Sequence, residues 1–440
     1  MAAIFWKSAV SDNWNVAADW SAGAVPTSAD DVTIAAPGSY TVTISAPDEA
    51  SALTFDALQG ALQENSGSLT VADALTVSSG LVSLNEANTI GVVIINGGTL
   101  AFGNSRALGA GTLDLSGAEL LATANETLSN VLVLSESSTI AAEHGTTLTE
   151  KSPGTSVAAG STLNIGALGQ DGTIVWDAAP STSSPFTAIT VQAGTLKGEA
   201  GALFFLFADS PIMVAAGATL DLAGNSLVST DLTGAGSVID SGAAETWVLD
   251  AANFSGAISG ALSLAFEGEA SLSGLEDNTG GATLDGSAIV ANTGTYDIVA
   301  NANISGAPVS SFINNGLFEK TGGSVSDVTT NFINGGALNV LSGSVKFSGG
   351  FTNHGVIHGL VTQSGGVTTI SAAVPSDFNG DGLSDILWQN ASGQASIWEM
   401  NANALIGGGG SAPTPDQAGP RSVAAISTAT GTPTSVAEHE

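Results

Sequence analysis

Phe312-Ile-Asn-Asn-Gly316, Phe332-Ile-Asn-Gly-Gly336 and Phe351-Thr-Asn-His-Gly355 are three copies of the pattern Phe-x-Asn-x-Gly. Their first residues are separated by 20 and then 19 positions. A repeat of about 20 residues matches one coil of a β-solenoid, in which equivalent residues of successive coils stack on one another. We therefore expect the three phenylalanines to form one inward-facing column.

A second phrase also recurs, since Ala158-Ala-Gly-Ser-Thr-Leu-Asn-Ile165 returns as Ala215-Ala-Gly-Ala-Thr-Leu-Asp-Leu222. The copies lie 57 positions apart, which equals three periods of 19. The phrase is unrelated to the phenylalanine pattern, and we interpret its displacement as three complete coils.

Short alternations of apolar and polar residues occur along the chain and predict strands of three to five residues. Clear examples are Thr41–Ile44, Leu69–Val71, Leu75–Val77, Leu113–Leu115, Leu163–Ile165, Leu220–Leu222, Leu338–Val340 and Val345–Phe347. The intervening segments are rich in Gly, Asn, Ser and Asp and leave no room for the helices of βαβ units. The chain is therefore predicted to be all-β.

The most consistent architecture is a right-handed parallel β-helix over residues 48–372, whose coils at 312–372 carry the phenylalanine repeat. At about 20 residues per coil it would contain roughly 16 coils and extend ~75–80 Å. An array of β-sandwiches is the alternative, with hairpins at pairs such as Asn96-Gly97, Asp285-Gly286 and Asn315-Gly316.

The composition restricts the function classes. The chain has 440 residues, 40 acidic against 7 basic, a formal charge of −33 and no cysteine. This charge opposes binding to nucleic acid and to anionic membranes, whereas carboxylates suit calcium at extracellular concentrations. Without cysteine, disulfides, thiolate zinc sites and cysteine nucleophiles are excluded.

The N-terminal 47 residues contain Trp6, Trp14 and Trp20, three of the seven tryptophans. Solenoids need a cap over the first coil, so we interpret residues 1–47 as a tryptophan-rich cap. The alternative is a platform on which sugar rings stack. The first residues show no basic segment followed by an apolar one, so export would use a signal elsewhere, such as the C-terminus.

The segment Gly103-Asn-Ser-Arg-Ala-Leu-Gly-Ala-Gly-Thr-Leu-Asp-Leu115 resembles the passenger-associated repeat of bacterial autotransporters and related surface proteins. The N-terminal stretch from Trp6 through Asp19-Trp-Ser-Ala-Gly23 to Ile34 resembles the opening segment of repeat-rich bacterial exoproteins. These resemblances imply a right-handed parallel β-helix and an extracellular or cell-surface location. The given sequence shows no alternating strands of an autotransporter's membrane barrel, so either the chain is not an autotransporter or that part lies elsewhere. We expect no membrane insertion of these residues.

Residues 373–406 are predicted to form a short C-terminal β unit that binds calcium. Oxygen ligands recur at alternate positions of one loop, and Gly382 permits its sharp turn. The ligands are Asp377, Asn379, Asp381, the Leu383 carbonyl and Asp385. Trp388 stands where an EF-hand has glutamate, so this is not an EF-hand. A turn of Asp, Asn and Gly without metal is the alternative.

The same segment resembles the FG-GAP or VCBS repeat of integrin-like propellers and bacterial exoproteins. That resemblance implies the side-chain ligands Asp377, Asn379, Asp381 and Asp385, and a strand core of Ile386, Leu387, Trp388 and Trp398. A single copy cannot close a propeller. Residues 407–440, rich in Gly, Ser, Pro and Thr, are predicted to be a flexible tail.

No catalytic or cofactor-binding residues are predicted. His354 and His358 lie four positions apart, but outside a helix this spacing does not place both on one metal. Lys151, Lys197, Lys320 and Lys346 are scattered and form no cluster. The sequence does not decide whether carboxylates pair across coils.

The leading hypothesis is therefore a non-enzymatic extracellular adhesin or structural rod of a bacterium, stabilised by calcium at its C-terminal unit. Its expected partner is an extracellular polysaccharide or a cell-surface ligand. The alternatives are a polysaccharide hydrolase or lyase, or a carbohydrate-binding module, on the same β-helix.

Calcium titration tests the C-terminal site. We expect one Ca²⁺ to bind with a Kd of about 10⁻⁴ to 10⁻³ M, as in extracellular modules, and to change the fluorescence of Trp388 and Trp398. Asp381→Ala should abolish the response, because it removes a carboxylate from the centre of the loop. A flat titration curve from both proteins would contradict the prediction that this loop binds Ca²⁺.

Overall fold

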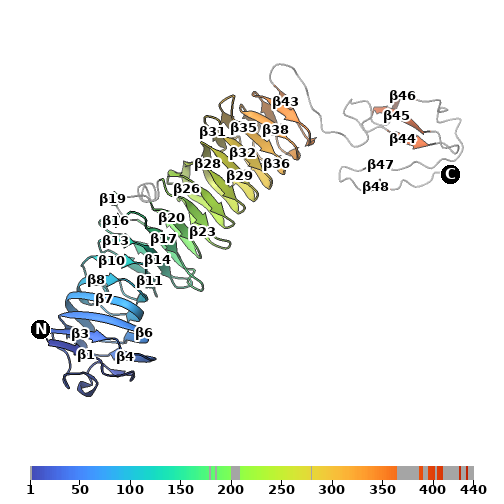
Figure 1. Ribbon diagram of the computed structural model, residues 1–440. Coiled ribbons are helices and arrows are strands. Elements are labelled where there is room, and N and C mark those ends of the chain that lie inside the picture. The colour runs from blue at the N-terminus through green and yellow to red at the C-terminus, as the bar shows by residue number, and fades with distance from the viewer. Residues whose placement is uncertain are drawn as a thin grey trace.

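The computed structural model describes residues 2–177, 180–183, 186–199, 209–278, 280–363, 386–389, 395–401, 404–409, 426–427 and 433–434. Up to residue 363 these residues form a parallel β-solenoid of about 16 turns, with almost no helix (Figure 1). Every pair of named strands from β1 to β43 is parallel, so the alternative of hairpin-linked sandwiches is wrong. No helix in the described part of the chain has the length and hydrophobicity of a transmembrane span.

Each coil contributes strands to three ladders, which we call faces 1, 2 and 3 in the order in which the chain visits them. Face 1 contains β2 (Asp12–Asn13), β4 (Tyr40–Ile44), the end of β6 (Ala52–Glu64), the end of β7 (Ser68–Leu84), β9 (Thr99–Phe102), β11 (Glu119–Ala122), β14 (Ser137–Ala142), β17 (Thr162–Ile165), β20 (Ala188–Val191), β22 (Ile212–Val214), β25 (Leu232–Gly234), β27 (Ala252–Phe254), β29 (Glu269–Leu272), β32 (Ile289–Asn292), β35 (Ser311–Asn314), β38 (Asn331–Asn334) and β41 (Phe351–Asn353).

Face 2 contains β5 (Pro47–Ala50), the starts of β7 and β8 (Thr89–Ile95), β12 (Glu126–Leu128), β15 (Thr147–Glu150), β18 (Thr173–Trp176), β21 (Thr195–Gly198), β23 (Thr219–Asp221), the starts of β26 (Ser237–Leu249) and β28 (Ala257–Phe266), β30 (Leu275–Asn278), β33 (Thr295–Ile298), β36 (Leu317–Lys320), β39 (Ala337–Val340) and β42 (Val356–His358).

Face 3 contains β1 (Ala2–Phe5), β3 (Asp30–Ile34), the start of β6, the middle of β7, the rest of β8, β10 (Leu113–Ser116), β13 (Leu132–Ser135), β16 (Thr155–Val157), β19 (Pro180–Ser183), β24 (Leu227–Ser229), the ends of β26 and β28, β31 (Ala282–Leu284), β34 (Ile304–Gly306), β37 (Val325–Val328), β40 (Ser344–Phe347) and β43 (Val361–Gln363).

The predicted phenylalanine column is confirmed on face 1. Phe312 pairs with Phe332 in register, and Phe332 pairs with Phe351. The ring centroids lie 5.3 Å apart for the first pair and 6.2 Å apart for the second. Phe312 and Phe332 are fully buried and Phe351 packs against the same core, so the repeat marks successive layers of the hydrophobic interior.

The asparagine of the same repeat forms a second column at the corner between faces 1 and 2. The Nδ2 atom of Asn314 donates to Asn334 Oδ1 at 2.8 Å, and Asn334 Nδ2 donates to Asn353 Oδ1 at 2.7 Å. Asn292 begins the column by donating to Asn314 at 2.8 Å. Because each amide is satisfied by the next coil, polar side chains are tolerated inside the solenoid.

The interpretation of the second recurring phrase is wrong. Residues 162–165 belong to β17 on face 1 and pair with β20, whereas residues 219–221 belong to β23 on face 2 and pair with β21. The coil length is not constant: hydrogen bonds between stacked coils span 27 and 28 residues near Asn164, but 19 residues near Asn353. The phrase encodes a turn with a positive-φ glycine followed by a strand, and this unit occurs on more than one face.

The N-terminal tryptophans are buried within the same hydrophobic core, at 2% exposure for Trp6 and 0% for Trp14 and Trp20. Trp20 packs edge-on against both others with centroid distances of 4.8 Å, and its Nε1 donates to the Trp14 carbonyl at 2.6 Å. Buried rings do not provide the open faces that a sugar-stacking platform needs. Parallel pairing already includes β1 to β4, before the predicted start at residue 48. The capping role stays a prediction.

Near the C-terminus, β44 (Ile386–Gln389), β45 (Ala395–Asn401) and β46 (Ala404–Gly409) form an antiparallel sheet. Two short strands, β47 (Ile426–Ser427) and β48 (Pro433–Thr434), form an antiparallel pair within the predicted tail. The predicted calcium ligands Asp377 to Asp385 lie outside the described residues, and calcium binding stays a prediction.

Two glutamates are buried inside the solenoid on face 2. Glu276 is aligned between Ile258 and Tyr296 in the inward column, and neither of its carboxyl oxygens has a hydrogen-bond partner among the described residues. Burial raises its pKa well above the usual value. Burial also raises the pKa of Glu150 to about 8. Burial therefore favours the protonated form of both carboxyls in the folded protein.

These two groups make stability pH-dependent. A raised folded-state pKa gives a contribution that is fully present below the unfolded-state value and is lost as the pH rises toward the folded-state value. For Glu150 this window runs from 4.5 to about 8. Relative to wild type, Glu150→Gln and Glu276→Gln should therefore gain unfolding free energy as the pH rises. For Glu150→Gln the gain is at most about 3 kcal/mol at pH 7.

Guanidinium unfolding at pH 5, 7 and 9 measures the effect. Glu267→Gln is the matched control, because Glu267 is exposed. A difference from wild type that stays constant across these pH values in both buried variants would contradict the assignment.

Candidate functional site

Face 2 is interrupted where the chain passes from Gly103 to Thr112. The preceding coil has Thr89 and Ile90 in the ladder and the following coil has β12, but the coil between them makes a turn instead of a strand. A missing strand leaves a depression in an otherwise continuous face. This turn belongs to the segment with the autotransporter-like sequence.

The turn forms because Asn104 caps it. The Asn104 side-chain oxygen accepts the Arg106 N–H at 2.9 Å, a local bond that favours a turn over an extended strand. The Arg106 carbonyl accepts N–H groups from Gly109 at 3.2 Å and from Asn88 of the preceding coil at 3.1 Å. Ala107 and Leu108 are buried in the core. The turn is thus anchored inward while Arg106 is exposed on its outer side.

Two glycines allow the turn to pack against the preceding coil. A Cβ at Gly109 would lie 2.6 Å from the Ile90 carbonyl oxygen, and Gly109 also has a φ of +65°. A Cβ at Gly111 would lie 1.6 Å from the Gly91 carbonyl oxygen. The segment Gly109-Ala-Gly111 is therefore required by close contact between backbones.

The following coil holds the turn from the other side. Asn130, which is buried, donates its amide to the Gly111 carbonyl at 2.8 Å and to the Gly109 carbonyl at 3.3 Å. The Thr127 N–H donates to Ser105 Oγ at 2.9 Å, and that hydroxyl donates to Glu126 at 2.5 Å. Side chains from the next coil therefore fix both ends of the turn.

The preceding coil adds a third support. Asn88 donates its amide to the Ala107 carbonyl at 3.1 Å and to the carboxylate of Glu64 at 3.1 Å. Glu64 is fully buried and also accepts the N–H groups of Asn85 and Glu86, at 2.8 and 2.9 Å. The position of the turn is therefore determined by a network that spans the stacked coils.

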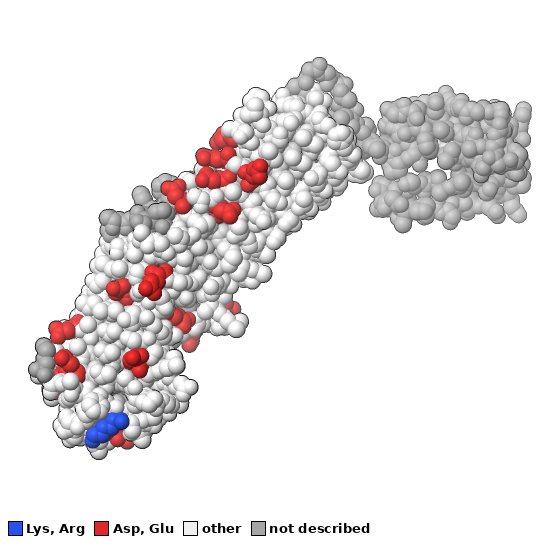
Figure 2. Space-filling view, in the orientation of Figure 1, with Lys and Arg blue, Asp and Glu red and all other residues white. Residues whose placement is uncertain are grey.

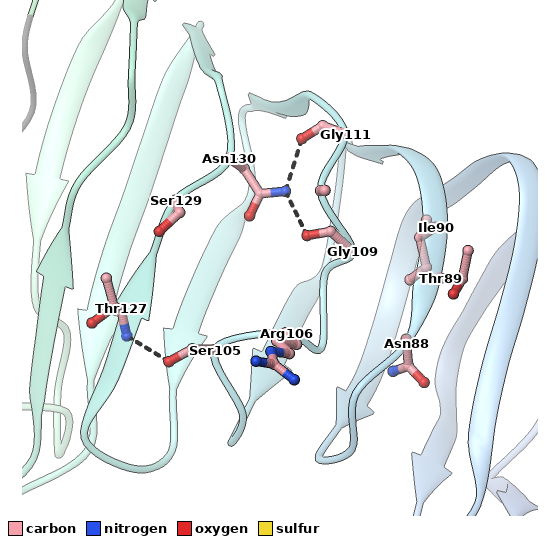
Figure 3. Close-up of a pocket in the computed structure, with 11 residues that line it drawn as sticks. Asn88, Thr89, Ile90, Ser105, Arg106, Gly109, Gly111, Thr127, Ser129 and Asn130 are labelled. Atoms are coloured by element: carbon pink, nitrogen blue, oxygen red, sulfur yellow. Dashed lines mark hydrogen bonds between the residues drawn. The ribbon is translucent and has the colours of Figure 1, made fainter.

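These three coils enclose a pocket of about 650 Å³ that is open to solvent (Figure 3). Its volume lies within the range of about 300–1,000 Å³ typical of small-ligand sites. Hydroxyl and amide side chains dominate the lining, with Arg106 as its one ionisable group. The lining residues are Asn88, Thr89, Ile90, Ser105, Arg106, Gly109, Ala110, Gly111, Thr127, Ser129 and Asn130.

Arg106 differs from the other cations that the structure describes. Its guanidinium makes no hydrogen bond or ion pair with any described residue. The bond from Arg106 to the Asn104 side chain uses the backbone N–H of Arg106. Each lysine of the described chain has a partner. Lys151, Lys197 and Lys346 pair with aspartates at 2.8, 3.4 and 3.0 Å, and Lys7 and Lys320 donate to backbone carbonyls.

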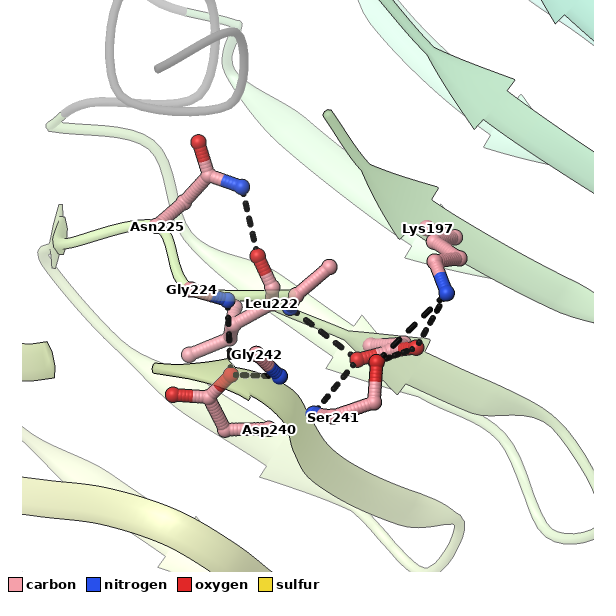
Figure 4. Close-up of polar contacts among 9 residues, drawn as sticks. Lys197, Leu222, Gly224, Asn225, Asp240, Ser241 and Gly242 are labelled. Carbon is pink, nitrogen blue, oxygen red and sulfur yellow. Dashed lines mark hydrogen bonds and ion pairs between the residues drawn. The ribbon is translucent and has the colours of Figure 1, made fainter. Parts of the chain in front are cut away.

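A second ionisable cluster lies farther along face 2 (Figure 4). Lys197 lies 3.4 Å from a carboxylate oxygen of Asp221, and Ser241 donates its hydroxyl to the same oxygen at 2.7 Å. Asp240 accepts the N–H groups of Gly224 and Gly242 at 2.7 and 3.0 Å. Both aspartates are almost fully buried and bind backbone amides, so this cluster ties adjacent coils together.

The histidines do not form a site in the described chain. His354 is exposed in a turn and His358 ends β42, while His144 pairs with Asp171 at 2.8 Å on the surface. Among the residues that the structure describes, no group of three or more histidines and carboxylates could hold a metal ion.

No residue of the pocket is among the site residues that the sequence predicted. One signal was present, because Arg106 is one of only seven basic residues and stands in a segment rich in turn-forming Asn and Gly. No protein-family model, curated protein or solved structure matches this chain.

Replacing Gly111 tests whether the pocket depends on close backbone contact. Gly111→Ala should lower the free energy of unfolding by about 3 kcal/mol or more, because the added methyl overlaps a carbonyl that cannot rotate away. Gly145→Ala is the control: it also lies in a turn, and no atom lies within 4 Å of its added Cβ. It should cost only about 1–2 kcal/mol through its positive φ. Equal losses in the two variants would show that the contact at Gly111 is not restrictive.

Proposed function

We propose that this protein is an extracellular rod that attaches to a glycan through its side, acting as an adhesin or a structural component of a bacterial surface or matrix. The observation that carries the proposal is the pocket at the interruption of face 2. The stacked coils on either side supply a rigid scaffold, and the network around the turn holds the lining groups in place before any ligand arrives.

A sugar suits this lining. The hydroxyl groups of Thr127 and Ser129 line the pocket and are of the kind that exchange hydrogen bonds with sugar hydroxyls. Ser105 Oγ, which already donates to Glu126 and accepts the Thr127 N–H, keeps one lone pair that can accept a further bond. Ala110, which is exposed, provides a small apolar surface against which a C–H group of a sugar ring could pack. A pocket on the flank of a rod also admits a long polymer, because neither end of the polymer has to enter the protein.

Binding fits the lining better than catalysis. Hydrolysis of a glycosidic bond commonly needs two carboxyl groups, and a lyase needs a base positioned near the substrate carboxylate. The residues that line the pocket include no carboxylate and no histidine. The nearest carboxylate in the network, Glu126, accepts a hydrogen bond from Ser105 and does not line the pocket.

The extracellular location and the calcium-stabilised C-terminal unit are part of the same proposal. The resemblance to autotransporter passengers and to FG-GAP or VCBS repeats supports them, as does the charge of −33, which suits a calcium-rich environment.

Binding to a panel of immobilised bacterial and plant polysaccharides tests the proposal. We expect at least one polysaccharide to retain the full chain, and Ala110→Trp to reduce that binding at least tenfold, because the indole fills the pocket. Ala159→Trp is the control, since Ala159 is an exposed turn residue on another coil. No release of reducing or unsaturated sugar ends is expected.

Two results would contradict the proposal. One is binding that Ala110→Trp and Ala159→Trp leave equally strong, which would place the interaction outside the pocket. The other is sugar release that depends on a single Asp or Glu, which would make the protein an enzyme.

A further inference from the structure

We infer that the pocket recognises an acidic sugar, with Arg106 pairing with the carboxylate of a uronic acid unit. This inference rests on the proposed function and adds the chemical class of the ligand. It starts from the contrast among the cations: in a chain of charge −33, Arg106 is the described cation whose side chain has no partner, and it lies in the pocket.

Two carboxylates belong to the network around the turn, but hydrogen bonds to other groups already occupy both of them. Glu126 belongs to the same network, but its carboxylate accepts the Ser105 hydroxyl at 2.5 Å. Glu64 is occupied by Asn88 and by two backbone N–H groups. Both acidic side chains are held by the hydrogen bonds that shape the turn, and the guanidinium is left facing solvent at the pocket.

The geometry around Arg106 favours a carboxylate over a hydroxyl. A guanidinium presents parallel N–H groups that bind both oxygens of a carboxylate at once, and such charged pairs are roughly twice as strong as neutral hydrogen bonds. The backbone of Arg106 is fixed by Asn104 on one side and by Asn88 on the other. The Thr127 and Ser129 hydroxyls then remain for the neutral hydroxyls of the same sugar.

The acidic surface does not prevent a carboxylate from binding at Arg106. Figure 2 shows, on one face of the molecule, carboxylates gathered in separate patches on a surface that is otherwise largely uncharged. At physiological ionic strength, charges act over a Debye length of about 8 Å, so distant patches do not cancel the local attraction to Arg106.

Chemical reduction of the ligand provides the test. Every polysaccharide that binds in a manner blocked by Ala110→Trp is compared in its native form and after reduction of its carboxylates to alcohols. We expect the native binder to contain uronic acid and to lose at least tenfold in affinity on reduction. Arg106→Gln should cause the same loss for the native polymer and no further loss for the reduced one. Arg106→Lys, which keeps the charge without the parallel N–H groups, should restore only part of the affinity.

The controls separate a pocket effect from a general effect of charge or folding. Lys346→Gln removes one positive charge from β40 and should leave binding unchanged. The thermal midpoint of Arg106→Gln should equal that of wild type, because the guanidinium contacts no described residue.

The outcomes distinguish the two proposals. If the pocket-dependent ligands are neutral, or if Arg106→Gln binds the native polymer as wild type does, the acidic-sugar inference is overturned and the proposed function stands. If no polysaccharide shows binding that Ala110→Trp reduces, the proposed function itself fails.

Discussion

The parallel ladder of backbone hydrogen bonds between successive coils is the constraint on which the rest of this structure depends. Each strand donates to and accepts from the coils on either side, so a residue in one coil is matched to a partner in the next. Identical side chains then stack in columns at the spacing between strands, and each column must be chemically self-compatible. The phenylalanine and asparagine columns satisfy this requirement by ring stacking and by amide-to-amide hydrogen bonds.

The same constraint makes an ionisable side chain in an inward-facing apolar column unfavourable. Glu276 lies between Ile258 and Tyr296, where burial favours the protonated form of its carboxyl. Lys320 is fully buried in the adjacent inward column and donates to the Ala300 and Gly322 carbonyls. Such groups are tolerated because buried apolar residues of the neighbouring coils surround them. They make the stability of the rod sensitive to pH.

The pocket is an exception of a different kind, in which a whole strand is absent from one ladder. Faces 1 and 3 continue through this coil as β9, β10 and β11, so the coil keeps its register while face 2 becomes a turn. Glycines at 109 and 111 let the turn approach the preceding coil, and Asn88 and Asn130 replace the missing ladder bonds with side-chain bonds. The backbone carbonyls of the turn need hydrogen-bond partners just as those of the strands do. Meeting that need with side chains leaves a depression with fixed polar walls.

The sequence by itself determined the all-β class, the stacking of coils and the column of Phe312, Phe332 and Phe351, because these follow from local alternation and from an exact short-range repeat. The sequence did not determine which face a repeated segment occupies, since coil lengths vary and a turn followed by a strand fits any face. For this reason the copies at 158–165 and 215–222 were wrongly interpreted as equivalent positions three coils apart. Burial of Trp6, Trp14 and Trp20, and the lack of a partner for Arg106 among the described residues, were decided only by the tertiary structure. Both depend on which side chains neighbouring coils bring alongside, and that depends on the length of every intervening turn.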